Sequence, residues 1–210
     1  MVNIIDAGFI INLSPGDEIK IMENIERAGR TAYKSEANIT SGSAKDFVEM
    51  LINRGHESVL EHECVSVRVI CDRGVSHEIV RHRIASYSQE STRYCNYSKE
   101  KFGNQITVID IRKYLKDDEY DDWIEAVENT EIHYFELLRK TGSPQLARSV
   151  LPNSLKTEIL ITMNLREWRH FFRLRTAKAA HPQMREIAIP MLNEFKGILP
   201  AVFDDIKVIE

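Results

Sequence analysis

Basic residues gather in two stretches of a chain that is acidic overall, and such clusters could bind an anion. The second stretch, between Asn164 and Arg185, contains two histidines and only one acid, Glu167. Its cations are Arg166, Arg169, Arg173, Arg175, Lys178 and Arg185. A solvated helix face is the ordinary interpretation of a basic stretch, and it stays open here beside ligand binding.

The first stretch has a pattern that suits a phosphate. Arg81-His82-Arg83 comes at the end of a predicted helix, and hydroxyl side chains follow at Ser86, Ser88, Ser91 and Thr92. Guanidinium groups bind phosphate through paired hydrogen bonds, and hydroxyls add further donors. The glycines form neither a GxGxxG fingerprint nor a Walker loop. Any nucleotide site must therefore depend on arginine.

Arg175 differs from the other cations because it lies at the end of an apolar helix face. Trp168 and Phe172 are four residues apart, and Leu165 and Arg175 extend the same face. An arginine in that place should be partly buried, and it then needs an anionic or hydrogen-bonding partner.

The sequence predicts no metal site. His77-Glu78 and His82 resemble part of the HExxH zinc motif, but histidines five residues apart lie about 140° apart around a helix. His56 and His62 flank a predicted loop, without a convincing third ligand nearby.

The three cysteines are expected to be free, packed thiols, because they lack CxxC spacing. Cys64 and Cys71 belong to a predicted buried strand and should be poor nucleophiles. Cys95 follows the hydroxyl-rich run, and its position alone does not exclude it.

Helices and strands are mixed without a regular βαβ alternation, which predicts an α+β fold with a largely antiparallel sheet packed with helices. Residues 1–210 are expected to form one domain. Strands or extended segments are expected over 2–13 (a strand or a hairpin), 63–71, 85–95 and 157–164. Helices are expected from Pro15 (with Ile19, Met22, Ile25 and Ala28 inward), from an N-cap at Ser43, over 75–83, over 117–139 (with Trp123, Val127, Tyr134 and Leu138 inward), from Pro144, and over 166–175 and 183–197.

Composition narrows the function classes. The formal net charge is −4, which argues against a general attraction to nucleic acid. No apolar run approaches the roughly 18 residues that a membrane span needs. The N-terminus lacks the basic start of a signal peptide. We expect a cytoplasmic protein without nucleic-acid or membrane partners.

The run Arg81-His82-Arg83, seven residues and then Ser91 matches the RHRx7S signature of flavin-dependent thymidylate synthases. Gly55–His62, Ala147–Pro152 and Met163–Arg175 resemble other segments of that family, in the same order. The resemblance implies reductive methylation of dUMP to dTMP, with FAD as cofactor and NADPH and 5,10-methylenetetrahydrofolate as co-substrates. It also implies a homotetramer with active sites shared between subunits.

The resemblance implies a role for each matching residue. Those expected to hold FAD are His56, Ser58, Arg81, His82, Arg83, Gln89, Asn164, Leu165, Arg166, His170 and His181. Those expected to hold dUMP are Glu78, Ile79, Val80, Arg81, Gln89, Glu90, Ser91, Thr92, Arg93, Arg148 and Arg175.

Arg175 is the expected catalytic residue. A fixed cation beside the uracil would stabilise negative charge that develops as C5 becomes nucleophilic. Arginine cannot be the base, because it does not deprotonate in proteins. This reaction would need no cysteine nucleophile, and Ser91 is interpreted as a substrate-binding hydroxyl rather than a nucleophile.

Some positions depart from the family pattern. Gln89 stands where glutamate is common, Glu78 where glutamine is common, and His170 where asparagine is frequent. The chain before His181 is about two residues longer than in shorter relatives. Two other functions stay open: a flavoprotein that oxidises NADPH without making dTMP, and a nucleic-acid-binding protein that uses the basic stretches.

Overall fold

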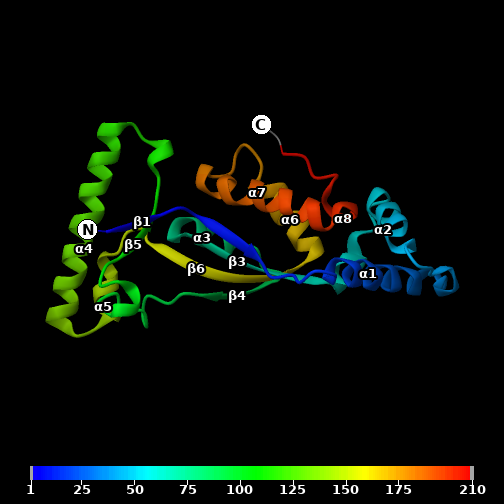
Figure 1. Ribbon diagram of the computed structural model, residues 1–210, viewed down its shortest axis with the longest axis horizontal. Helices are drawn as coiled ribbons and strands as arrows, with labels where there is room; N and C mark the ends of the chain where they lie inside the picture. The colour runs from blue at the N-terminus through cyan, green and yellow to red at the C-terminus, as the bar shows by residue number, and fades with distance from the viewer. Residues whose placement is uncertain (1, 209–210) are drawn as a thin grey trace. The chain divides into compact units, whose positions relative to one another are not determined.

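The computed structural model describes residues 2–208, which fold into helices and strands in irregular alternation (Figure 1). The strands are β1 (Asn3–Ile5), β2 (Gly8–Ile11), β3 (Cys64–Asp72), β4 (Ala85–Gln89), β5 (Thr107–Ile109) and β6 (Lys156–Asn164). The α-helices are α1 (Asp17–Tyr33), α2 (Ser43–Asn53), α3 (Arg73–Ile79), α4 (Asp117–Thr141), α5 (Pro144–Ala147), α6 (Leu165–Arg175), α7 (Pro182–Ile198) and α8 (Pro200–Phe203). Short 3-10 helices include η2 (Glu57–His62) and η5 (Arg148–Val150).

The chain forms two compact units, each built from three separate segments. Unit 1 contains residues 1–8, 69–79 and 88–159, and unit 2 contains residues 9–68, 80–87 and 160–210. The expectation of one domain over 1–210 stays a prediction.

The main sheet is antiparallel along its centre, as the sequence predicts. Its strand order is β2-β3-β6-β4. β3 and β4 run from unit 2 into unit 1, whereas β6, which pairs with both, runs from unit 1 into unit 2. Along β6 every second side chain is buried, including Ile159, Ile161 and Met163. The α+β class with a mostly antiparallel sheet is confirmed.

The N-terminal segment does not form a hairpin, so that alternative is wrong. β1 pairs with β5 in parallel, with Asn3 opposite Thr107, and β2 joins the main sheet beside β3. Two strands separated by only two residues therefore belong to different sheets. The alternation of apolar residues shows that a segment is extended, but it does not show which strand becomes the partner.

Unit 1 has its core under α4, the long helix drawn in green in Figure 1. Tyr120, Val127, Tyr134 and Leu138 are buried along one face of this helix, while Trp123 is only partly buried. The core cluster also contains Tyr97, Ile106, Val108, Ala147 and Leu155. Acids in the first turn and Gly142 (φ 63°) at the C-terminal end match the preferences of a free-standing helix.

Unit 2 has an aromatic core between α6, α7 and α8. Trp168, Phe171 and Phe172 of α6 contact each other, and Phe195 and Phe203 extend the cluster. The Trp168 indole N–H donates to the Val65 carbonyl at 3.0 Å, which fixes α6 against β3. Because this helix is so firmly packed, the polar side chains on its other faces are held in place.

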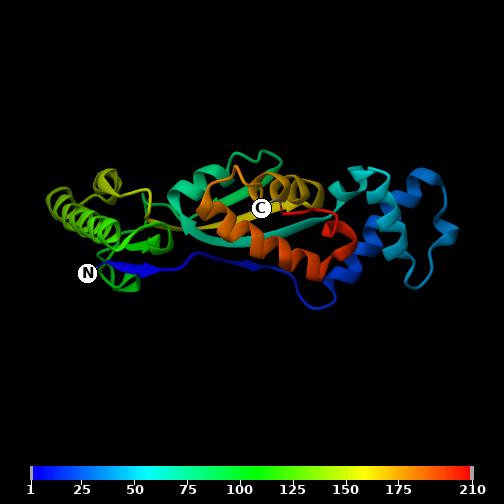
Figure 2. The ribbon, with the colours of Figure 1, turned by 90° about the horizontal axis from the view of Figure 1, so that it is seen from above.

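The predicted inner face of α1 is partly wrong. Ile25 is buried, but Ile19 is 60% exposed. The buried face is rotated toward Glu26 and Gly29, where α2 packs beside α1, as Figure 2 also shows. Glu26 is buried because Arg30 pairs with it at 2.7 Å and the Ser43 hydroxyl donates to it at 2.8 Å. The sequence of α1 alone does not predict the contact with Ser43.

Two helix ends differ from expectation. Gly42 (φ 88°), rather than Ser43, occupies the N-cap of α2, since the Ser43 hydroxyl is engaged with Glu26. The predicted helix over 75–83 ends at Ile79, so Arg81, His82 and Arg83 lie beyond α3. Among residues 2–208, no helix is long and apolar enough to cross a membrane.

Candidate active site

The predicted site residues fall into two groups, one in each unit. Unit 1 holds Glu78, Ile79, the run Gln89–Arg93 and Arg148. Unit 2 holds the others: His56, Ser58, Val80, Arg81, His82, Arg83, Asn164, Leu165, Arg166, His170, Arg175 and His181.

In unit 2, one cavity brings the two basic stretches together. Its volume is about 600 Å³, and its walls come from the segment after α3, from α6 and from residues 177–180. We name it the arginine cavity; its polar walls are Arg81, His82, Arg83, Glu167, His170 and Arg175. Arg81 and Arg83 are exposed, and among the described residues neither has a hydrogen-bonding or ion-pair partner. This cavity can therefore accept an anionic ligand.

His82 is the buried centre of this wall, with only 4% of its surface exposed. Its Nε2 atom lies 3.2 Å from Nε of Arg175, and its Nδ1 atom lies 2.9 Å from Oε1 of Glu167. The arginine Nε–H can only donate, so His82 Nε2 must be the acceptor. The imidazole is consequently neutral, with its proton on Nδ1 and donated to Glu167.

The electrostatic surroundings agree with a neutral imidazole. Burial lowers the pKa of His82, and the positive charge of Arg175 lowers it further, although the hydrogen bond to Glu167 acts in the opposite direction. Below its ordinary range, the pKa leaves the ring uncharged at neutral pH. The expectation that Arg175 is partly buried is confirmed, and its Nε–H is engaged by His82.

Glu167 is a site residue that the sequence prediction missed. It lies in the first turn of α6 and is 9% exposed. Its backbone N–H donates to the side chain of Asn164, which is the N-cap of α6. The available signal was that Glu167 is the one acid inside the second basic stretch, because a buried acid there must contact a cation or a hydrogen-bond donor.

Three of these side chains are close enough together to hold a metal ion, since ligand atoms of His82, Glu167 and His170 lie within 4.8 Å of one another. A metal ion would have to replace the hydrogen bond between His82 and Glu167. It would also lie beside Arg81, Arg83 and Arg175 on the same cavity wall. We therefore treat the three residues as a hydrogen-bonded and packed group rather than as ligands.

A second cavity of about 290 Å³ also has Glu167 and His170 in its wall, with Asn164 and Arg166. Arg166 pairs with Glu61 of η2 at 2.5 Å, so its direction is already fixed. Asn164 uses its side-chain oxygen as the N-cap of α6. The structure thus places Asn164, Arg166 and His170 on the wall of one cavity, and their role toward FAD stays a prediction.

Other residues predicted to hold FAD do not line these two cavities. His56 is exposed and bonds the Tyr33 hydroxyl through Nδ1 at 3.0 Å, and Ser58 is exposed. His181 is exposed at the start of α7, next to Ala180 of the arginine cavity. Leu165 is fully buried, and its backbone N–H donates to the Glu63 carbonyl at 2.9 Å.

Arg169 is a structural cation of α6. It is 1% exposed, and its guanidinium pairs with Asp205 at 2.6 Å and with Glu57 at 3.0 Å, and donates to the Val202 carbonyl. Arg173 also pairs with Glu57, at 2.9 Å. These ion pairs join α6 to η2 and to the segment after α8.

In unit 1, the end of the hydroxyl-rich run, Ser91 and Thr92, lies at a turn beside two arginines. The Ser91 carbonyl accepts from the backbone N–H groups of Tyr94 and Cys95. Arg148 donates to the Thr92 hydroxyl at 3.3 Å, and Arg93 donates to the Gln145 side chain at 3.2 Å. The structure therefore brings Thr92, Arg93 and Arg148, which are up to 56 residues apart, toward the same turn.

Gln89 has a structural reason to be an amide. Its side-chain nitrogen donates to the hydroxyls of Ser76 at 2.9 Å and Thr157 at 3.2 Å. The Ser76 hydroxyl already donates its proton to the Arg73 carbonyl, so it needs a donor as its next partner. Glutamate at position 89 could not provide one.

Glu90 contacts a lysine that the sequence analysis did not select. Lys156 lies 3.1 Å from Glu90 and 2.6 Å from Glu158. Burial alone would lower the pKa of Lys156, but its two carboxylate partners outweigh burial and raise it. Three other residues predicted to bind dUMP differ in their exposure: Ile79 is 1% exposed, Val80 is 39% exposed and Glu78 is half-buried.

The three thiols are poor nucleophiles. Burial raises the pKa of Cys71 to about 12, and burial also raises the pKa values of Cys64 and Cys95, helped by Glu63 and Glu90 respectively. The expectation that all three are packed is wrong for Cys64, which is exposed because it is the first residue of β3 and points away from the core.

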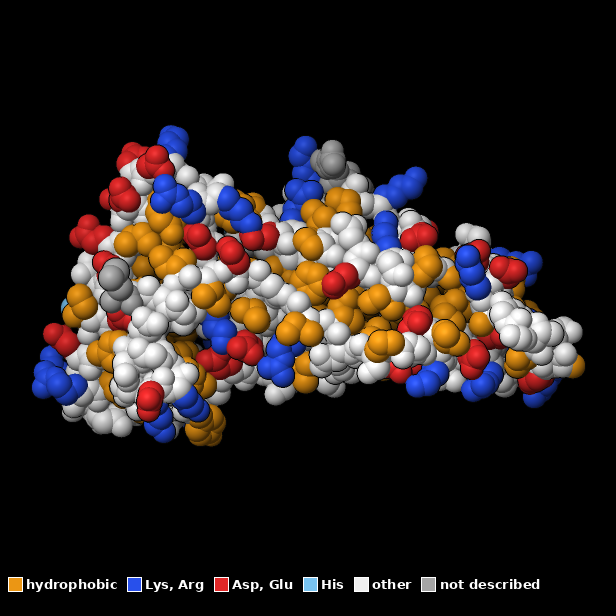
Figure 3. All heavy atoms as spheres, in the orientation of Figure 1, with side chains coloured by type: hydrophobic (Ala, Val, Ile, Leu, Met, Phe, Trp, Pro, Cys, Tyr) orange, Lys and Arg blue, Asp and Glu red, His pale blue; other side chains and the backbone are white. Residues whose placement is uncertain are grey.

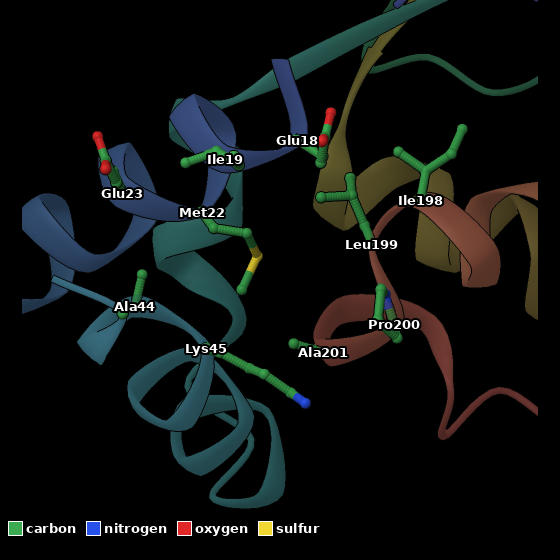
Figure 4. A pocket seen from close by; sticks show the side chains of 11 residues that line it. Glu18, Ile19, Met22, Glu23, Ala44, Lys45, Ile198, Leu199, Pro200 and Ala201 are labelled. Atoms are coloured by element: carbon green, nitrogen blue, oxygen red, sulfur yellow. The ribbon is translucent and has the colours of Figure 1, made fainter. Parts of the chain in front are cut away.

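A third cavity, of about 250 Å³, lies between α1, α2 and the start of α8 (Figure 4). Its walls are mainly apolar, with Met22, Leu199 and Pro200, and Lys45 extends into it. None of the predicted site residues lines it. It is more apolar than the arginine cavity, but it lacks the set of side chains that could handle a phosphate or a reacting group.

Comparisons with known proteins show the family of this chain. The family described as thymidylate synthase complementing protein matches residues 18–201. A protein from Pyrococcus furiosus named flavin-dependent thymidylate synthase is 36% identical over 183 residues, covering 86% of this chain and 72% of that protein. The chain belongs to the flavin-dependent thymidylate synthase family.

Other relatives extend the similarity. A flavin-dependent thymidylate synthase from Mycobacterium tuberculosis (strain ATCC 25618 / H37Rv) is 34% identical over 208 residues, covering 88% of this chain and 79% of that protein. The crystal structure of the UMP/dUMP methylase PolB from Streptomyces cacaoi, bound with 5-Br dUMP, matches with a TM-score of 0.77 at 22% identity. That match covers 97% of this chain and 96% of the other, and it shows a shared fold.

The residues of the RHRx7S signature lie in both units of this structure. All three of its basic residues line the arginine cavity of this flavin-dependent thymidylate synthase family member. Ser91, at the other end of the signature, belongs to unit 1. The signature thus spans the two groups of predicted site residues, and the chain is an enzyme of this family.

Proposed function

We propose that the protein catalyses the reductive methylation of dUMP to dTMP, with 5,10-methylenetetrahydrofolate as carbon donor and NADPH as reductant. The observation that carries the proposal is the arginine cavity, where Arg175 is held by a neutral, buried His82 beside Arg81 and Arg83. Membership of the flavin-dependent thymidylate synthase family, shown over residues 18–201, supports it.

The residues of unit 2 suit FAD as the cofactor. A dinucleotide carries a negatively charged pyrophosphate, and the unpaired guanidinium groups of Arg81 and Arg83 match that charge. His170 and Arg166 would add hydrogen-bond donors from α6. When bound, the flavin would supply the hydride that turns the transferred methylene carbon into a methyl group.

The overall reaction needs one carbon and one hydride equivalent. C5 of the uracil loses its proton and forms a bond to the methylene carbon of the folate. Both carbon–nitrogen bonds of that methylene group break, and the two nitrogens gain the equivalent of the C5 proton and one solvent proton, so that tetrahydrofolate leaves. NADPH provides the two electrons and becomes NADP⁺. The chain's own contribution is to hold the uracil, to stabilise charge that develops on it, and to exclude competing water.

Arg175 is the proposed catalytic residue. A guanidinium beside the uracil would stabilise the negative charge that develops when C5 attacks the carbon donor. Because His82 holds the Arg175 Nε–H, the guanidinium plane is fixed before substrate arrives. A fixed charge need not reorganise during the reaction, which is the main source of electrostatic catalysis.

The turn at Ser91–Arg93 and Arg148 are proposed to bind the dUMP phosphate. The hydroxyls and guanidinium groups there are gathered by the Arg148–Thr92 and Arg93–Gln145 hydrogen bonds. The resemblance also leads us to propose a homotetramer with shared active sites. Such an assembly would explain why the predicted residues fall into two groups.

The test is dTMP formation by the purified protein with dUMP, methylenetetrahydrofolate, NADPH and FAD, and with each component omitted in turn. We expect dTMP only in the complete mixture. Bound FAD and NADPH oxidation without dTMP would instead indicate a flavoprotein of this fold without methyl transfer. Absence of flavin binding, together with salt-sensitive DNA or RNA binding, would refute the proposal.

A further inference from the structure

Glu167, which lies outside the RHRx7S signature, is linked through His82 to Arg175, the proposed catalytic residue. Glu167 and Arg175 are eight residues apart, which is about 12 Å along a helix. His82, from the segment after α3, bridges them with one ring nitrogen on each. The three side chains form a continuous hydrogen-bonded chain along one wall of the arginine cavity.

Contacts with residues outside this hydrogen-bonded group hold Glu167 and His82. The Glu167 backbone N–H donates to the Asn164 side chain at 2.8 Å. The His82 carbonyl accepts from the Tyr87 hydroxyl at 2.6 Å, and the His82 ring packs against Phe171 with ring centres 5.0 Å apart. In this arrangement the acceptor that the Nδ1 proton meets is Glu167 Oε1, at 2.9 Å.

We propose that Glu167 is a positioning residue for Arg175. By accepting the Nδ1 proton of His82, it leaves Nε2 as a lone-pair acceptor, and that acceptor holds the Nε–H of Arg175. A neutral imidazole in water prefers the opposite tautomer, with the proton on Nε2. Without an acceptor at Nδ1, two N–H groups would face each other, and the Nε–H of Arg175 would lose its acceptor on His82.

This inference rests on the proposed function, because the catalytic role of Arg175 belongs to that proposal. The hydrogen-bonded chain itself can be tested without turnover. We would label the histidines with ¹⁵N, record the ring-nitrogen signals of the purified protein with its bound flavin at pH 7.5, and assign His82 by its loss in His82→Gln. We expect the Nδ1–H tautomer in the unmodified protein.

Three variants separate positioning from general damage. Glu167→Gln keeps an oxygen that can accept the Nδ1 proton, whereas Glu167→Met keeps the size but removes the acceptor. The control is Glu119→Met, because Glu119 has the same third position in the first turn of α4 and accepts from the Lys116 backbone there.

In dTMP assays we expect Glu167→Met to lower kcat by about 10- to 100-fold, which is typical when a residue that orients another functional group is lost. The KM for dUMP should change less. The His82 signals of this variant should move toward the Nε2–H tautomer. Glu167→Gln should keep the Nδ1–H tautomer of His82 and lower kcat by less than about tenfold. Glu119→Met should leave both the tautomer and kcat unchanged.

Two results would overturn the inference. The first is an imidazolium, or an Nε2–H tautomer, in the unmodified protein, which would show that Nε2 does not accept from Arg175. The second is unchanged kcat in Glu167→Met despite an altered tautomer. If the unmodified protein made no dTMP, the proposed function would fail, while the ring-nitrogen signals would still decide whether Glu167 sets the tautomer.

Discussion

The ion pairs around Arg169 lead to a stability prediction that does not depend on the enzyme's activity. This guanidinium is 1% exposed and pairs with two carboxylates, Glu57 at 3.0 Å and Asp205 at 2.6 Å. The perturbation is to neutralise them, singly and together, as Glu57→Gln and Asp205→Asn. The amide oxygens can still accept hydrogen bonds, so the change removes mainly charge.

The structure sets the expected magnitudes. With one carboxylate removed, Arg169 keeps the other within 3.0 Å, so each single change should cost only about 1 kcal/mol of unfolding free energy. The cost for Asp205 should be at the lower end, because its side chain is 43% exposed and screened by solvent. With both removed, a buried cation has no counter-charge, and the cost should reach about 3–5 kcal/mol. The double variant should therefore exceed the sum of the singles by about 1 kcal/mol or more.

Urea unfolding at pH 7.5, at one fixed protein concentration, gives the four midpoints of this cycle. Arg173→Gln is the control, because that side chain is 46% exposed and should cost less than about 1 kcal/mol. A double variant that loses no more than the sum of the two singles would refute the reasoning. It would mean that the buried charge of Arg169 is satisfied by groups other than these carboxylates.

Three further predictions follow from the site and the ion pairs. Arg175→Ala should keep bound flavin but lower kcat for dTMP by about 10²–10³-fold, since one preorganised electrostatic group is lost; unchanged turnover would contradict its role. Burial alone would raise the pKa values of Glu57 and Asp205, but Arg169 and Arg173 outweigh burial and lower them, so their contribution is present at neutral pH and is lost as pH falls below about 4. Thermal unfolding against pH should therefore show a steeper acid loss in the unmodified protein than in the double amide variant. Joint replacement of the three cysteines by Ser or Ala should leave dTMP formation largely intact, and a folded but inactive variant would revive a thiol mechanism; the positions are Cys64, Cys71 and Cys95.

The sequence predicts best where the signal is local. The alternation over 157–164 identifies β6 and its buried side correctly, because a strand between two others buries every second residue whatever its partners are. The spacing of Leu165, Trp168 and Phe172 likewise predicts that Arg175 is partly buried, which the structure confirms. Both predictions require only the geometry of one element.

Prediction fails where the partner is distant in the chain. Helix α1 buries Glu26, which accepts from Ser43 of α2, whereas the apolar Ile19 is exposed. Arg169 is one of six cations in the second basic stretch, and nothing beside it in the sequence shows that its carboxylate partner Asp205 lies 36 residues further on. For the same reason Glu167 stays unremarkable until the fold brings His82, 85 residues away, against it.

The three-segment construction of each unit has a consequence for how the chain reaches its folded state. β1 cannot find β5 until Thr107 has been made, 104 residues after Asn3. At about 5–20 residues per second of synthesis, the strand waits about 5–20 s with its backbone groups unpaired. Unit 2 waits longer, since α6 and its partner Asp205 come last. Pairings this distant in sequence slow folding, and neither unit can be cut out as one continuous fragment. Neither unit can therefore complete its fold before the last of its three segments has been made.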